Sequence, residues 1–107
     1  MEIIDKVFKE KPNENLEELF NKYHEAYNKE NKCREMYAMK EAIIEHDKLN
    51  RIDNLMTNGG FNITTARNKV EAELAEDRFE LVKIDHSIHH YRMEKKVFRL
   101  LIEYMME

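Results

Sequence analysis

The chain has few residues that interrupt helices or cross-link chains. Its 107 residues include two glycines, one proline, one cysteine and no tryptophan. A single cysteine cannot form an internal disulfide bond, so we expect a reducing compartment, the cytoplasm. The sequence also has no apolar run of the roughly 20 residues that span a bilayer, and no apolar core of a signal peptide. We therefore expect no membrane association.

The chain is rich in charged residues. Charged residues make up 37% of it and hydrophobic residues 42%, a balance typical of helical proteins with solvated outer faces. The net charge of −4 argues against a general nucleic-acid-binding protein, because such proteins are usually basic. A chain of this length forms one domain at most.

The second half of the chain carries a heptad repeat. Its positions are separated by alternating steps of four and three residues, the spacing of a helix that packs lengthwise against another helix. These seam positions are Val70, Leu74, Asp77, Leu81, Ile84, Ile88, Tyr91, Lys95, Phe98, Ile102 and Met105.

The pattern predicts two helices in the first half of the chain. A short amphipathic helix covers residues 2–10 and stops at Pro12, because proline cannot continue a helix. A long helix covers residues 15–57 and is capped by Asn13 or Asn15, of which Asn15, followed by Glu18 three residues later, resembles a capping box. A break or a weak spot is expected in its polar stretch 28–34.

A third helix is predicted for residues 64–106. It follows the turn Asn58-Gly59-Gly60, where glycine permits the left-handed conformation that ends a helix. The two long helices are nearly equal in length, which predicts an all-α, antiparallel, coiled-coil-like hairpin in a single domain covering residues 1–107.

Matching the two arms gives a register. If residues 57 and 65 flank the turn, Asp77 faces Lys40 and Ile44, and Lys95 faces Glu25 and its neighbours. A buried charge with an opposite partner can fix the register of two helices. The alternative is that both seam charges reach solvent along their aliphatic stems.

A hairpin two helices thick cannot cover all of its apolar residues. Those flanking the seam include Val82, Val97, Leu101 and Tyr104. We therefore expect a homo-oligomer that completes a bundle, or else a surface reserved for another partner.

In the same register, the middle of the hairpin is basic. Residues 19–40 and 81–100 together hold ten basic and five acidic residues. Such a zone can bind phosphates or an acidic protein surface, or it is a solvated face with local ion pairs. Exposed aromatic residues for base stacking are not interleaved with the charges, which disfavours nucleic acid. The candidates for partner binding are Lys22, Lys29, Lys32, Arg92, Lys96 and Arg99.

Histidine and cysteine supply the only candidate metal chemistry. His86 and His90 lie one helical turn apart, and the register brings Cys33 opposite them, so that a thiolate and two imidazoles resemble a zinc environment. No CxxC or HExxH motif accompanies them, and nothing fixes a fourth ligand. We therefore predict no metal and no cofactor, with Cys33 as a small buried apolar residue.

Residues 64–83, TTARNKVEAELAEDRFELVK, and the hairpin plan resemble small helical proteins of phages and prophages from low-GC Gram-positive bacteria. The resemblance covers residues 64–105 best and includes no diagnostic motif, so no functional residue is transferred. It implies an accessory protein of recombination or replication, or an inhibitor of a host protein, including anti-CRISPR and other anti-defence factors. The helical hairpins of type VII secretion are a second resemblance. The missing tryptophan of their WxG turn and the spacing of Tyr104 and Glu107 count against it.

The sequence thus predicts a cytoplasmic, non-enzymatic protein that binds another macromolecule. A host protein is the expected partner if the chain is phage-encoded. The alternative is a nucleic-acid-associated accessory protein that uses the basic zone.

Overall fold

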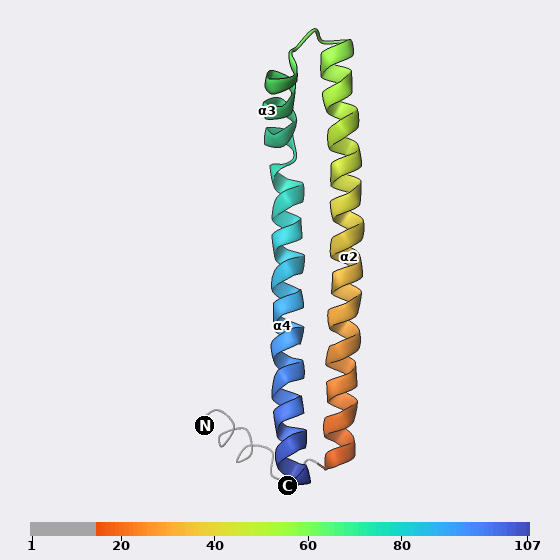
Figure 1. Ribbon diagram of the computed structural model, residues 1–107, viewed down its shortest axis with the longest axis vertical. Coiled ribbons are helices and arrows are strands. Elements are labelled where there is room, and N and C mark those ends of the chain that lie inside the picture. The colour runs from red at the N-terminus through yellow and green to blue at the C-terminus, as the bar shows by residue number, and fades with distance from the viewer. Residues whose placement is uncertain (1–14) are drawn as a thin grey trace. The chain divides into compact units, whose positions relative to one another are not determined.

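The computed structural model describes residues 15–107. They form the helices α2 (Leu16–Thr57), α3 (Ile63–Glu73) and α4 (Ala75–Met106), which Figure 1 labels. No strand occurs between residues 15 and 107, so the all-α class is confirmed for this part of the chain. The predicted helix at residues 2–10 lies outside the described residues.

Helix α2 begins where the capping pattern predicts. The side-chain oxygen of Asn15 accepts a hydrogen bond from the Glu18 backbone N–H at 2.8 Å, which satisfies one of the free donors of the first turn. The Glu18 carboxylate in turn accepts from the Asn15 side-chain amide at 3.4 Å. Every residue of the stretch 28–34 is helical, so the break considered there does not occur.

The turn after α2 depends on both glycines. Gly60 has a φ of 70°, the left-handed region that glycine enters without a steric penalty. At Gly59 a Cβ would lie 2.8 Å from the backbone oxygen of Leu55 and 3.0 Å from the Phe61 ring. A side chain at position 59 would therefore displace the Phe61 ring or the end of α2.

The predicted third helix at 64–106 differs from the structure in two ways. It begins one residue earlier, at Ile63, because the side chain of Asn62 accepts from the Thr65 N–H at 2.9 Å and caps it. It is also interrupted at Leu74, whose φ of −88° and ψ of 2° depart from helical values and separate α3 from α4.

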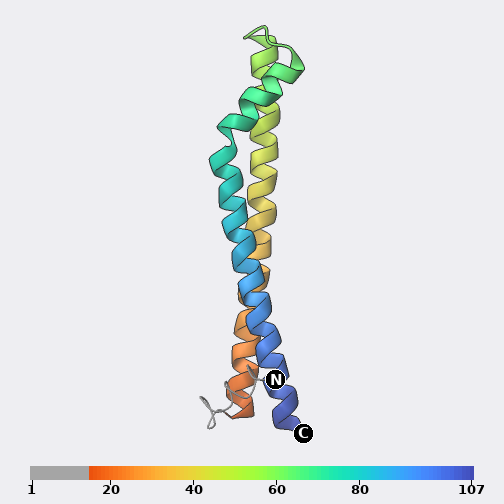
Figure 2. The same cartoon turned by 90° about the vertical axis from the view of Figure 1, so that its left-hand side faces the viewer.

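The chain changes direction at this interruption, as Figure 2 shows. The segment contains neither glycine nor proline, the usual local causes of a kink. Val70, in α3, and Leu74, at the interruption, are both fully buried in one cluster with Ile44 and Ile52 of α2. The bend therefore lies in a part of the chain that is packed against α2.

The chain divides into two compact units. The loop unit is Cys33–His86, and the terminal unit is Met1–Lys32 with Ser87–Glu107. In the loop unit, α3 and the start of α4 run back along the second part of α2 (Figure 1). The core of the loop unit consists of Ile44, Ile52, Ala66, Val70, Leu74 and Leu81, with Tyr37 and Leu55 packed against it.

The terminal unit has its own hydrophobic cluster. Leu19 from α2 is buried with Leu101 and Ile102 from α4, and Tyr23 and Phe98 pack against them. In each unit two antiparallel helical segments bury their facing apolar side chains, the arrangement expected of a hairpin. The prediction that the whole chain is a single domain stays a prediction.

The heptad seam is confirmed over most of its length. Its positions from Val70 to Ile102 are buried or half-buried, whereas Met105 is 43% exposed. Asp77 does face Lys40, with 3.7 Å between the Lys40 ammonium and the carboxylate. Both side chains keep a third or more of their surface exposed, so this seam charge reaches solvent. Among the described residues, no helix is long and apolar enough to span a membrane.

Candidate functional site

Three of the predicted partner-binding residues lie on one face of α4 in the terminal unit. Arg92, Lys96 and Arg99 are spaced by four and three residues, so they follow one another along the helix. Together with Tyr23, Met93 and Lys95 they line a groove of about 400 Å³, which we call the basic groove.

Three of the four cations of the basic groove, Arg92, Lys96 and Arg99, are poorly neutralised by residues 15–107. Neither Arg92 nor Lys96 makes an ion pair with another residue of the range 15–107, and both are exposed. Within the same range, Arg99 pairs with the Glu103 carboxylate one turn away, at 3.8 Å, which is a weak pair on an exposed face. The groove therefore presents positive charge to whatever enters it.

Lys95 closes the inner side of the basic groove. Its ammonium lies 3.1 Å from the carboxylate of Glu30, which is only 5% exposed, and 5.2 Å from the centre of the Tyr27 ring. The sequence predicted Glu25 or a neighbour as the partner of Lys95, whereas in the structure its partner is Glu30. A buried carboxylate must be paired with such a cation, so the role of Lys95 is structural.

The three basic candidates on α2 differ from those on α4. Lys29 pairs with Glu25 at 2.9 Å, and the hydrogen bond to that carboxylate raises the pKa of Lys29. Lys22 and Lys29 line a second groove, of about 260 Å³, together with Glu25 and Glu94. Lys32 is exposed and lines neither groove. The basic zone is thus split into a mixed-charge groove and the basic groove.

The candidate metal ligands do not form a cluster. Cys33 is half-buried, while His86 and His90 are exposed, and the His90 ring nitrogen lies 3.5 Å from the Glu94 carboxylate. Within residues 15–107, no three histidine, cysteine, aspartate or glutamate side chains come together as metal ligands.

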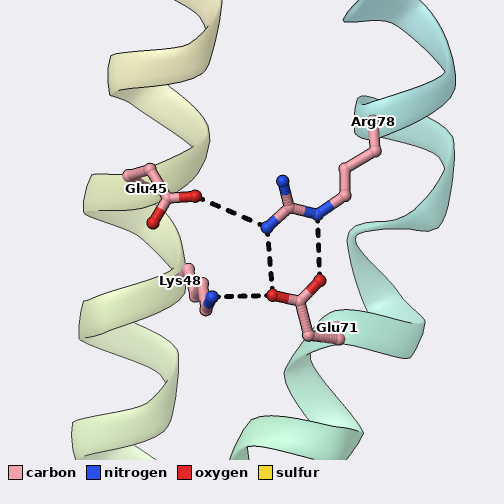
Figure 3. A network of polar contacts seen from close by, with 4 residues as sticks. All are labelled: Glu45, Lys48, Glu71 and Arg78. Carbon is pink, nitrogen blue, oxygen red and sulfur yellow. Dashed lines mark hydrogen bonds and ion pairs between the residues drawn. The ribbon is translucent and has the colours of Figure 1, made fainter. Parts of the chain in front are cut away.

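A network of four charged residues lies in the loop unit, across the interruption at Leu74 (Figure 3). Arg78 of α4 donates two hydrogen bonds to the Glu71 carboxylate of α3, at 2.9 and 3.0 Å. From α2, the Lys48 ammonium approaches Glu71 at 2.7 Å, and Glu45 accepts from Arg78 at 3.4 Å. These bonds hold α3 and α4 to each other and to α2, so we read the network as structural.

The hydrogen bonds from Arg78 and Lys48 lower the pKa of Glu71 to about 2. The bonds to Glu71 also raise the pKa of Arg78. Both shifts favour the charged forms, as expected for a bidentate arginine–carboxylate pair. The network therefore stays intact at neutral pH.

The sequence did not identify this network, nor Tyr23 and Met93 as part of the basic groove. The register that paired Asp77 with Lys40 also places Glu71 near Lys48 and Arg78 near Glu45. The pair Glu71–Arg78 is two helical turns apart, a separation at which side chains of one straight helix do not meet. The bidentate contact exists because the helix is interrupted between them.

Comparison of the chain with protein-family models, with curated proteins and with solved structures gives no match.

Proposed function

We propose that the protein is a non-enzymatic binding factor that holds an acidic segment of a partner protein in its basic groove. The observation that carries the proposal is the pair Arg92 and Lys96. They lie one turn apart at the same groove and have no carboxylate partner within residues 15–107. Arginine presents its donors as a planar fork that matches a carboxylate.

The other groove residues favour protein over nucleic acid. Met93 is 57% exposed beside the charges, and methionine, tyrosine and arginine are enriched in protein interfaces. Tyr23 is half-buried, and its ring contacts His24 edge-on at 5.8 Å, so it does not offer an open face for stacking bases.

The test uses a labelled oligoglutamate peptide and labelled single- and double-stranded oligonucleotides in fluorescence anisotropy. We expect the peptide to bind and the double variant Arg92→Glu/Lys96→Glu to weaken binding by about tenfold or more, since each tenfold needs only about 1.4 kcal/mol. The matched control is Lys32→Glu/Arg67→Glu, which reverses two exposed charges outside the groove. It should bind like the unmodified chain.

Two results would contradict the proposal. Equal loss of peptide binding in the control would show a non-specific charge effect. Submicromolar oligonucleotide affinity that survives physiological salt would favour the alternative, a nucleic-acid-associated accessory protein, because counterion release makes weak contacts salt-sensitive.

We further infer that the partner is a host protein and that the chain acts as a phage-encoded modulator or inhibitor. The support is the resemblance of residues 64–83 to small phage and prophage proteins. A pull-down from a lysate of a low-GC Gram-positive bacterium, compared between the unmodified chain and Arg92→Glu/Lys96→Glu, would identify that partner by mass spectrometry.

Self-association is part of the same proposal. Of the flanking residues expected to need cover, Leu101 is buried and Val97 half-buried by the chain itself. Val82 and Tyr104 remain 49% and 60% exposed. Large apolar side chains left open on helix faces are commonly covered by further helices, as in a bundle.

A further inference from the structure

The loop unit contains an apolar groove that its own side chains leave open. Met36, Met39 and Ile43 of α2 line it together with Ile84 of α4, and its volume is about 300 Å³. Met39 and Ile43 are 66% and 64% exposed. Nothing in the preceding proposal for the basic groove uses this surface.

The open side chains follow helical spacing. Met36, Met39 and Ile43 are separated by three and four residues, which places them on one face of α2 beside the buried Ile44. This is the spacing at which a second helix packs lengthwise. The groove therefore fits a helix as its occupant.

The charged residues of α2 at the groove indicate which helix would bind there. Lys40 lies three residues before Ile43, and Asp47 lies four residues after it. Both line the groove, as does Asp77 of α4 on the side of Lys40. A partner of one charge sign would repel either Lys40 or Asp47. A second copy of α2, running antiparallel, would instead place Lys40 of each chain against Asp47 of the other, since a two-fold interface pairs each residue with its counterpart.

We propose that α2 of a second copy of this chain covers the groove, antiparallel about a two-fold axis beside Ile43. This inference rests on the self-association proposed above and names its surface. Present contacts permit the new ion pairs. The Lys40 ammonium lies 3.7 Å from Asp77, beyond hydrogen-bond distance. Asp47 uses one oxygen toward Arg51 at 3.0 Å, and its second oxygen can accept from Lys40 of the other copy.

The first test measures mass by light scattering and sedimentation over a range of micromolar concentrations. We expect a dimer for the unmodified chain and a monomer for Ile43→Glu, which sets two carboxylates together at the axis. Leu49→Glu is the matched control, because Leu49 is 65% exposed on α2 and lies outside the groove. It should stay dimeric.

The second test exchanges the charges. Lys40→Glu sets a glutamate against Asp47, and Asp47→Lys sets two lysines together, so each should weaken dimerisation by at least about tenfold. The double variant Lys40→Glu/Asp47→Lys rebuilds both pairs with reversed polarity and should restore the dimer. Circular dichroism of each variant checks that the helices persist.

A monomer at every concentration would overturn both the self-association and this groove as its surface. A dimer that survives Ile43→Glu and both single charge reversals would overturn the groove alone. Failure of the double variant to recover, with helices intact, would overturn the two-fold arrangement.

Discussion

Glu71 receives hydrogen bonds from two cations on different elements. Arg78 binds it from α4 and Lys48 from α2, so its carboxylate is stabilised in the charged form relative to the unfolded chain. Its pKa of about 2 lies below the ordinary value of 4.5. A carboxyl group with a lowered pKa contributes stability above its unfolded pKa and loses that stability as the pH falls toward its folded pKa.

We predict that this linkage appears as a pH-dependent cost of Glu71→Gln. The variant should unfold at a lower temperature than the unmodified chain at pH 7. The difference should shrink below pH 4.5 and vanish near pH 2, where Glu71 becomes protonated. Thermal unfolding followed by circular dichroism across this range measures it. Glu41→Gln, at an exposed position of α2, is the control, and an equal pH dependence for both variants would refute the linkage.

At the scale of the element, polar or glycine residues set three of the helix ends: the start of α2, the end of α2 and the start of α3. Asn15 caps α2 and Asn62 caps α3 through the same type of bond to the third residue along. Gly60 supplies the left-handed conformation that separates the two helices. The heptad repeat indicates where helices lie, and these residues determine where they begin and end.

We predict that Asn62→Ala destabilises the chain by about 1 kcal/mol, the usual cost of losing an N-cap. Asn68 lies inside α3 and is exposed, so Asn68→Ala makes the same chemical change without removing a cap. This control should be neutral or slightly stabilising, because alanine favours a helix interior. Urea unfolding midpoints compare the two. Equal losses would mean that the Asn62 cap does not contribute.

At the scale of the whole molecule, the described chain contains two separate hydrophobic clusters. Leu74 is completely buried in the cluster of the loop unit, and Leu19 is 2% exposed in that of the terminal unit. The two clusters have no residue in common. Cooperative opening often follows such local clusters.

We predict that Leu74→Ala and Leu19→Ala each cost about 2–5 kcal/mol, as for other buried leucines, but weaken different parts of the chain. Hydrogen exchange read by mass spectrometry should show faster exchange mainly within residues 33–86 for Leu74→Ala. For Leu19→Ala the faster exchange should lie within residues 15–32 and 87–107. A uniform increase along the chain in both variants would show that the two units open as one.

The sequence by itself determined the helical class, the seam from Val70 to Ile102, the Asn15 cap and the glycine turn. These features depend on residues close together in the chain, and helical periodicity and capping are local effects. The pairing of Asp77 with Lys40 followed because equal arms and one turn leave little freedom of register. Arg92, Lys96 and Arg99 were predicted to share one stripe because their spacing of four and three residues is that of one helix face.

The tertiary structure decided what depends on contacts between segments. No glycine or proline marks the interruption at Leu74, and only the structure locates it. The interruption in turn allows Arg78 to bind Glu71. The packing of α4 against α2 places Glu30, and not Glu25, beside Lys95. Spacing along a helix gives the direction of a side chain. Whether a charged side chain is neutralised depends on the residues that pack beside it in the structure. Lys29 is neutralised by Glu25, whereas Arg92 lies at an open groove.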